Sequence, residues 1–170
     1  MPLTLRSPAF DHHGDVPRRH TCDGEDVSPP LAWEQPPRDT RSFVLLVDDP
    51  DAPDPRAPQR VWVHWLVYGL PADARRLAEG ASPDALPDGA REARNDFGRT
   101  AWGGPCPPIG RHRYFFRLHA LDVTLGDLGP SAGRREVEAA MHGHVLATAE
   151  LMGTYERSAR RTLYHDSSRD

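Results

Sequence analysis

The chain has 170 residues, of which 38% are hydrophobic, and a net charge of -4 from 21 Lys and Arg against 25 Asp and Glu. This length favours one domain with a real core, and the charge gives no electrostatic case for a surface that binds DNA or RNA. Because no apolar run approaches the ~20 residues of a membrane span and no signal-like start is visible, the sequence predicts a cytoplasmic protein.

Two apolar segments in the first half predict β-strands. Residues 42–47 form a short β-branched and aromatic run that ends at a turn cluster, as is typical of a buried strand. Residues 61–68 are largely apolar on both faces, so this strand is expected at the centre of a sheet. Its alternation predicts one face made of Val61, Val63, Trp65 and Val67, and another made of Trp62, His64, Leu66 and Tyr68.

A third strand is predicted for residues 112–121, where one row of side chains begins polar and becomes apolar. His112 and Tyr114 start this row, and Phe116 and Leu118 continue it toward the core. This order indicates a pocket at the strand end. Because His112 is expected at the mouth of the pocket, its loss should impair ligand binding more than stability.

The last quarter of the chain predicts a helix. Apolar residues and His144 recur at helical spacing from Val137 to Leu151, and Gly153 is placed to end the helix. Before it, residues 71–101 are mostly turn and loop because they are rich in Pro, Gly and Asp.

The pattern as a whole predicts a mostly β protein. Several strands followed by one or two helices in the C-terminal part favour an antiparallel β-sandwich of the Greek-key type. We assign residues 1–156 to a single domain and expect the polar residues 157–170 to form a flexible tail.

Two segments join a Pro-rich loop to a predicted strand that carries a histidine. The first runs from Asp48 to Pro53 and precedes His64, and the second runs from Gly103 to His112. Proline restricts the backbone, so the carboxylate of Asp49 is held in place. A carboxylate beside two imidazoles favours their charged form, and this combination predicts a small pocket for an anion.

Simpler interpretations of the same residues stay open. Asp49 fits an ordinary Asx turn, and a strand histidine such as His64 is more often a hydrogen-bonded core residue than a ligand contact. The Gly103–Pro108 segment can be a rigid connector and nothing more, and Trp62 and Tyr114 can be packing residues.

The two segments resemble the paired signature loops of the phosphatidylethanolamine-binding protein (PEBP) family, also called the Raf kinase inhibitor protein family. Four further segments are similar to its bacterial and archaeal YbhB/YbcL-like branch: Thr21–Gly24, Ser28–Leu31, Asn95–Arg99 and Met141–Ala147. The resemblance implies a sandwich of two sheets and a cis peptide at Ala52–Pro53. The resemblance and the chemistry of the individual residues together give the expected ligand-binding residues: Asp49, Pro53, Trp62, His64, Gly104, Pro105, His112 and Tyr114.

The function expected from these residues is non-catalytic binding of a phosphate-type group, such as a phospholipid head group, a phosphorylated side chain or a free anion. The resemblance adds a kinase or a protease as a protein partner. A second copy of the chain, in a homodimer, is a separate expectation. We expect no cofactor, no metal and no catalytic residue, because the sequence has no Gly-x-Ser-x-Gly elbow, Walker loop, dinucleotide fingerprint or His-Glu-x-x-His motif. The alternatives are a hydrolase or phosphatase that uses His64, His112 and Asp49, and a surface interaction protein with a vestigial pocket.

Two cysteines, Cys22 and Cys106, lie beside the signature segments. They lack the number and spacing of a zinc site, and two reduced thiols are the preferred interpretation. The alternative is one disulfide between the N-terminal loop and the pocket loop, as expected in an oxidising compartment or a thermophile.

Overall fold

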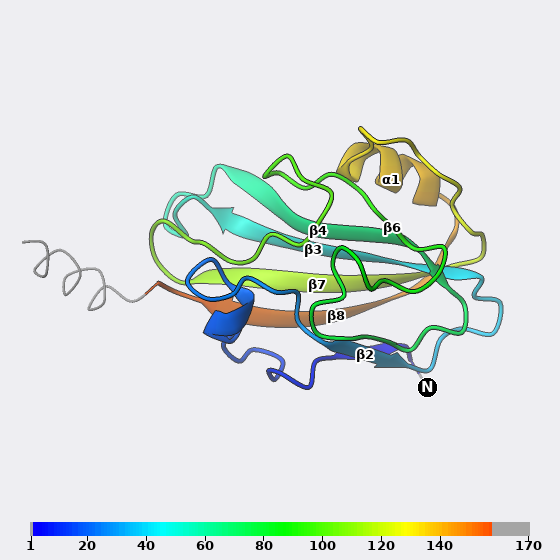
Figure 1. The fold of residues 1–170 in the computed structure, drawn as a ribbon, viewed down its shortest axis with the longest axis horizontal. Helices are drawn as coiled ribbons and strands as arrows, with labels where there is room; N and C mark the ends of the chain where they lie inside the picture. Colours follow the sequence, from blue (N-terminus) through cyan, green and yellow to red (C-terminus); the bar gives the residue numbers. More distant parts are fainter. Residues whose placement is uncertain (1, 158–170) are drawn as a thin grey trace, which may run out of the picture.

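The computed structural model describes residues 2–157, and Figure 1 shows strands in antiparallel sheets with one α-helix near one end. The elements are β1 (Thr4–Arg6), the 3-10 helix η1 (Arg18–His20), β2 (Leu31–Glu34), β3 (Ser42–Ala52), β4 (Arg60–Pro71), β5 (Arg76–Leu77), β6 (Arg91–Glu92), β7 (His112–Leu121), α1 (Arg134–Met141) and β8 (Val145–Tyr155). No helix in this part of the chain is long and apolar enough to cross a membrane.

Two sheets give the chain its mostly β architecture. The small sheet has the strand order β1-β2-β5, and the large sheet has the order β6-β4-β3-β7-β8. In the large sheet β3 pairs with β4 on one side and with β7 on the other, although β4 and β7 are far apart in the sequence. The predicted antiparallel fold with a helix in the C-terminal part is confirmed.

The core has two layers, one on each face of the large sheet. Between the sheets, Trp33 of the small sheet packs against Phe43 of the large one, with ring centroids 5.7 Å apart. On the opposite face, Val137 and Met141 of α1 join a second apolar cluster with Tyr68 of β4. Burying both faces of the large sheet explains why β3 and β4 are apolar on both sides.

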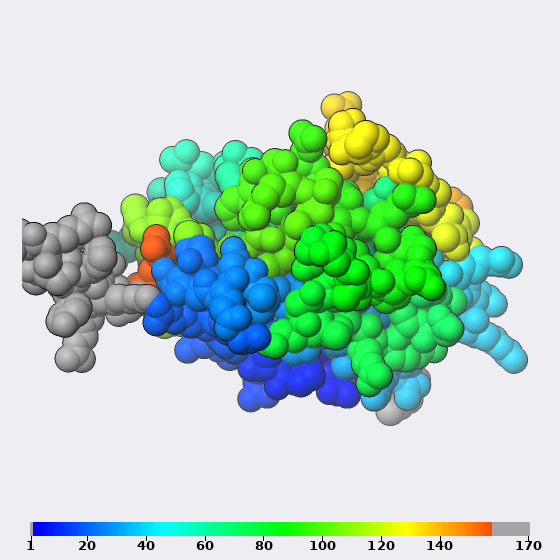
Figure 2. All heavy atoms as spheres, viewed as in Figure 1, coloured from blue at the N-terminus to red at the C-terminus, as the bar shows by residue number. Residues whose placement is uncertain are grey.

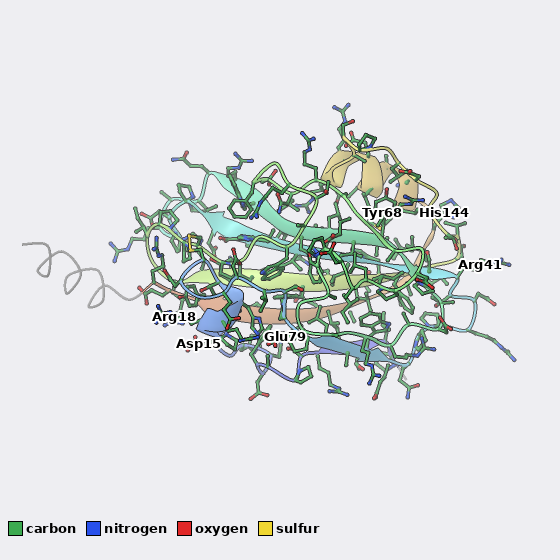
Figure 3. All side chains as sticks on the ribbon, viewed as in Figure 1. Asp15, Arg18, Arg41, Tyr68, Glu79 and His144 are labelled. Atoms are coloured by element: carbon green, nitrogen blue, oxygen red, sulfur yellow. A yellow bond between two sulfur atoms is a disulfide. The ribbon has the colours of Figure 1, made fainter. Side chains whose placement is uncertain are left out.

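Loops from both halves of the chain cover one face of the molecule. Figure 2 shows the N-terminal segment (blue) packed beside the loops that follow β4 (green). A backbone hydrogen bond of 2.9 Å from Gly80 to Ser28 and an ion pair of 2.9 Å between Arg19 and Glu79 hold these segments together. Figure 3 labels Glu79 and also Arg18, which precedes Arg19 in the sequence.

Strand β3 extends further than the sequence predicted. The apolar run ends at Val47, but β3 continues to Ala52 because β4 pairs with it that far, whereas the pairing with β7 ends at Asp48. Asp49 therefore lies on a strand, opposite Trp62, and not in the Pro-rich loop that the sequence predicted. The predicted strands of residues 61–68 and 112–121 are present within β4 and as β7.

The predicted alternation of β4 was wrong at His64. Val47 pairs with Trp65 and Asp48 with Val63, so His64 is an extra residue in the register, as in a β-bulge. The bulge reverses the alternation. As a result Val63 belongs to the helix-side cluster, whereas Trp65 belongs to the cluster between the sheets.

The predicted helix was also wrong in extent. Helix α1 ends at Met141, where Gly143 has a φ of +82°, a conformation that glycine adopts readily at a helix end. The residues from Val145 to Tyr155 form β8, which pairs with β7. His144, labelled in Figure 3, is half exposed and binds Asp122 with 2.8 Å between Nδ1 and Oδ1, so it is not a core residue.

The predicted tail lies almost wholly outside the described residues. Arg157 is its first residue, and its Nη2 lies 3.1 Å from the Asp23 carboxylate. The prediction for residues 158–170 falls beyond the described part of the chain.

Candidate functional site

A cavity of about 310 Å³ lies at the end of the large sheet where β3 stops and where β4 and β7 begin. Helix α1 lies toward the other end in Figure 1. The cavity brings together side chains from both signature segments. Its lining consists of Asp49, Ala52, Pro53, Gln59, Arg60, Trp62, His64, Phe97, Cys106, Pro107, Pro108, His112 and Tyr114.

Asp49 and His112 form a buried pair in the wall of this cavity. His112 Nδ1 lies 2.6 Å from Asp49 Oδ2, and His112 Nε2 lies 2.8 Å from the Ile109 carbonyl oxygen. Both ring nitrogens therefore face acceptors, an arrangement that suits a doubly protonated imidazolium. Burial raises the pKa of Asp49, while the hydrogen bonds from His112 and from the Asp51 backbone oppose that shift.

His64 has a different environment from His112. Its Nδ1 lies 2.6 Å from the Gly103 carbonyl oxygen, so Nδ1 carries the proton and donates it. Burial lowers the pKa of His64 to about 4. The imidazole is therefore neutral near neutral pH, and the expectation of two charged histidines was wrong for His64.

Two hydrogen-bond donors in the cavity wall are unsatisfied. The Tyr114 hydroxyl and the Trp62 indole Nε1 are both buried, and neither has a partner among residues 2–157. Burial raises the pKa of Tyr114, so its hydroxyl keeps its proton. Because a buried polar group without a partner is costly, an acceptor atom that reached either donor would lower the free energy of the structure.

Phe97 completes an aromatic wall that our site prediction omitted. Its ring lies edge-on to Trp62 and to His64, with centroids 5.3 and 5.4 Å away. Asn95 shapes the loop that carries it: Nδ2 donates to the Ala101 carbonyl oxygen at 2.8 Å, and Oδ1 accepts from the Phe97 backbone at 3.0 Å. Gly103 leaves room for the ring, because a Cβ there would collide with Phe97.

Arg60 supplies an exposed positive charge beside the cavity. Its guanidinium lies 4.5 Å from the centroid of the Trp62 ring and 3.8 Å from the Asp96 carboxylate. The contact with Trp62 has cation–π geometry. Arg60 was absent from the residues expected from sequence, although it precedes Trp62 by two positions at the start of β4.

Gly104 and Pro105 do not line the cavity, although the resemblance places them at its rim. The Gly104 backbone donates to Asp26 Oδ1 at 2.9 Å, and the Pro105 carbonyl oxygen accepts from Cys22 at 3.1 Å. A Cβ at Gly104 would collide with Asp26. The two residues therefore fix the second signature segment to the N-terminal loop.

A disulfide makes the same connection covalently. Cys22 and Cys106 are bonded, with Cα atoms 5.4 Å apart, so the preferred prediction of two reduced thiols was wrong. Because the two cysteines are 84 residues apart, their spacing in the sequence does not indicate that they pair. Figure 3 shows the yellow sulfur–sulfur bond toward the end of the molecule away from α1. The peptide between Ala52 and Pro53 is cis, as the resemblance implies.

The geometry and the fold together define a class: antiparallel β-sandwich proteins with a small cavity at the ends of the central strands. Residues 6–156 match the phosphatidylethanolamine-binding protein family model, and the chain belongs to that family.

Individual relatives extend over nearly the whole chain. A "UPF0098 protein" of Methanothermobacter thermautotrophicus is 48% identical, with 91% of this chain and 99% of the relative aligned. The crystal structure of the PEBP homologue CT736 from Chlamydia trachomatis is 40% identical, with a TM-score of 0.83 and coverage of 92% and 99% of the two chains. Escherichia coli YbcL is 31% identical, with a TM-score of 0.84 and coverage of 93% and 100%.

Proposed function

We propose that this protein is a non-catalytic binding protein whose cavity accepts a phosphate-type anion. The observation that carries the proposal is the pair of buried donors, Trp62 Nε1 and Tyr114 Oη, which lack partners among residues 2–157 and belong to side chains that line the cavity. Oxygen atoms of an anion would accept both hydrogen bonds. Hydrogen bonds to a charged acceptor are stronger than those between neutral groups, so the free energy gained would favour an anion.

Charge contributes less to this proposal than the sequence indicated. His64 is neutral, and both ring nitrogens of His112 already contact Asp49 or the Ile109 carbonyl oxygen, at 2.6 and 2.8 Å. Arg60 remains as a cation in the lining, and it is partly offset by Asp96 at 3.8 Å. Recognition would therefore depend on directed hydrogen bonds, with Arg60 attracting the anion to the mouth.

The family name makes a phospholipid head group one source of such an anion, and a phosphorylated side chain is another. A phosphorylated side chain would connect the cavity to regulation of a kinase. Two further proposals are inhibition of a protease and a vestigial cavity beneath an interaction surface. Both predict that variants of the cavity residues bind their protein partner normally.

One observation favours the hydrolase alternative. A neutral His64 can accept a proton at Nε2, since its Nδ1 proton is held by Gly103, although a pKa of about 4 makes it a weak general base near neutral pH. His112 is less suited to act with it, because both of its nitrogens are engaged. Turnover of a phosphoester that is lost in His64→Ala would favour the enzyme.

Isothermal titration calorimetry with inorganic phosphate tests the proposed function, with nitrate as a control for simple anion attraction. We expect saturable binding of phosphate that is weakened at least about tenfold in Trp62→Phe, which keeps an aromatic ring but lacks the N–H donor. Absence of phosphate binding, or equal binding of nitrate, would contradict a phosphate-type site.

The cellular compartment is a separate proposal. The sequence predicts the cytoplasm, whereas the Cys22–Cys106 disulfide favours an oxidising compartment or a thermophilic source. Alkylation of free thiols in intact cells tests the cytoplasmic prediction. In a mesophilic cytoplasm we expect both cysteines to be reduced and therefore alkylated.

A further inference from the structure

The polar groups of the cavity are of two kinds, and the difference bears on the ligand. Trp62 Nε1 can only donate a hydrogen bond, and the Tyr114 hydroxyl can donate one. His64 acts in the opposite sense: its Nδ1 donates to Gly103, so Nε2 presents a lone pair and can only accept. The Gly104 backbone also acts to raise the pKa of His64, but no residue among 2–157 makes a hydrogen bond to Nε2.

A ligand that satisfies both kinds of group needs acceptor atoms and a proton to donate. A phosphate monoester in its monoanionic form has both, because one of its oxygens carries a hydrogen. A phosphodiester has the same single charge but no O–H, so it would leave His64 Nε2 without a partner. Leaving a polar atom of the cavity wall unpaired beneath a bound ligand opposes binding.

We propose that the cavity selects phosphate monoesters over phosphodiesters, with His64 Nε2 accepting the hydrogen bond of the ligand P–O–H group. This inference rests on the proposed function and assigns its ligand class. It favours a phosphorylated side chain or free phosphate over the head group of a phospholipid, which is a phosphodiester.

The surroundings of His64 support its role as an acceptor. Burial is the main reason that its pKa is lowered to about 4, and the nearby charges of Asp96 and His112 act in opposite directions. Asp49 and Arg60 are the other charged residues of the lining. Asp49 already accepts hydrogen bonds from His112 at 2.6 Å and from the Asp51 backbone at 2.7 Å, which leaves His64 as the more available acceptor.

Calorimetric titration with methyl phosphate and dimethyl phosphate tests the selectivity on the unmodified protein. At about pH 5, below the second phosphate pKa of about 6, both ligands carry essentially one negative charge, and only methyl phosphate has an O–H. We expect methyl phosphate to bind at least about tenfold more tightly, and we expect the preference to decline above about pH 6 as that proton is lost.

The variant His64→Phe tests whether His64 causes this preference, because it keeps a buried ring and removes the Nε2 acceptor. The two esters are compared on the variant itself, and we expect it to bind them equally, without the preference for methyl phosphate. Equal affinity for the two esters in the unmodified protein would overturn the selectivity and leave the anion site standing. A preference that survives His64→Phe would overturn the role of His64, and failure of both esters and of phosphate to bind would overturn the proposed function itself.

Discussion

Asp49 and His112 form a buried pair in which Oδ2 and Nδ1 lie 2.6 Å apart, joining β3 to the start of β7. The His112 side chain is 0% exposed and that of Asp49 is 5% exposed. Since His112 Nε2 also reaches the Ile109 carbonyl oxygen, the imidazole connects the strand pair to the second signature segment. The pair therefore has a structural role in addition to its position in the cavity wall.

This geometry changes the expected effect of His112→Ala. Removing one member of a buried pair leaves the other charge uncompensated, so the variant should lose roughly 3–5 kcal/mol of unfolding free energy in urea denaturation. His119→Ala is the matched control, because His119 lies on the same strand with its Nδ1 2.8 Å from Thr148 Oγ1 in an exposed contact. The control should cost less than about 1 kcal/mol. Similar small losses in both variants would show that the pair contributes little to stability.

The lowered pKa of His64 predicts a specific loss of stability in acid. The unfolded state takes up a proton near the ordinary value of 6.5, whereas the folded state resists protonation down to about 4. The contribution of His64 is therefore complete above pH 6.5 and falls by about 1.4 kcal/mol per pH unit below it, for a total of roughly 3 kcal/mol near pH 4.

Comparison with His64→Gln isolates this contribution, because all other titrating groups are shared. Denaturation at a series of pH values should give a shallower loss of stability in the variant between pH 6.5 and 4. Parallel stability curves for the two proteins would show that His64 does not titrate as its burial requires.

The disulfide predicts a redox-dependent stability. Cys22 and Cys106 are separated by 84 residues, and closing a loop of that length stabilises by roughly 4.6 kcal/mol in the chain-entropy model. Urea denaturation with and without a thiol reductant measures the effect, and the Cys22→Ser, Cys106→Ser double variant should show no further change on reduction. An unfolding midpoint that is insensitive to reductant in the unmodified protein would contradict this stabilisation.

Much of the fold is visible in local patterns of the sequence. Residues 42–47 and 112–121 are strands because their apolar and alternating side chains suit a sheet that is covered on one or both faces. The secondary-structure predictions were wrong at places where a single residue changes the course of the backbone. The extra residue at His64 reverses the alternation of β4, and Gly143 ends a helix whose apolar spacing continues into β8.

The candidate site was only partly accessible to sequence reasoning. Asp49 and His112 stand in motifs of unusual composition, so they could be named before their contact was known. Arg60 could not, because an arginine at a strand start has no periodic signal. Phe97 lies in the Asn95–Arg99 segment that resembles the family, but its place in the cavity wall depends on tertiary structure. The single proton on His64 follows from its hydrogen bond to Gly103, which depends on tertiary structure.

The most direct test of the central claim, that the cavity binds a phosphate-type anion through unsatisfied donors, compares Tyr114→Phe with Tyr68→Phe. Tyr114 Oη has no partner among residues 2–157, whereas Tyr68 Oη, near α1 in Figure 3, accepts a hydrogen bond from the Leu128 backbone at 3.1 Å. Calorimetry with inorganic phosphate and urea denaturation should be run on both variants. The account predicts that Tyr114→Phe keeps or gains stability and loses at least about tenfold in phosphate affinity, whereas Tyr68→Phe loses about 1 kcal/mol of stability and binds normally. Unchanged phosphate affinity in Tyr114→Phe would contradict the account.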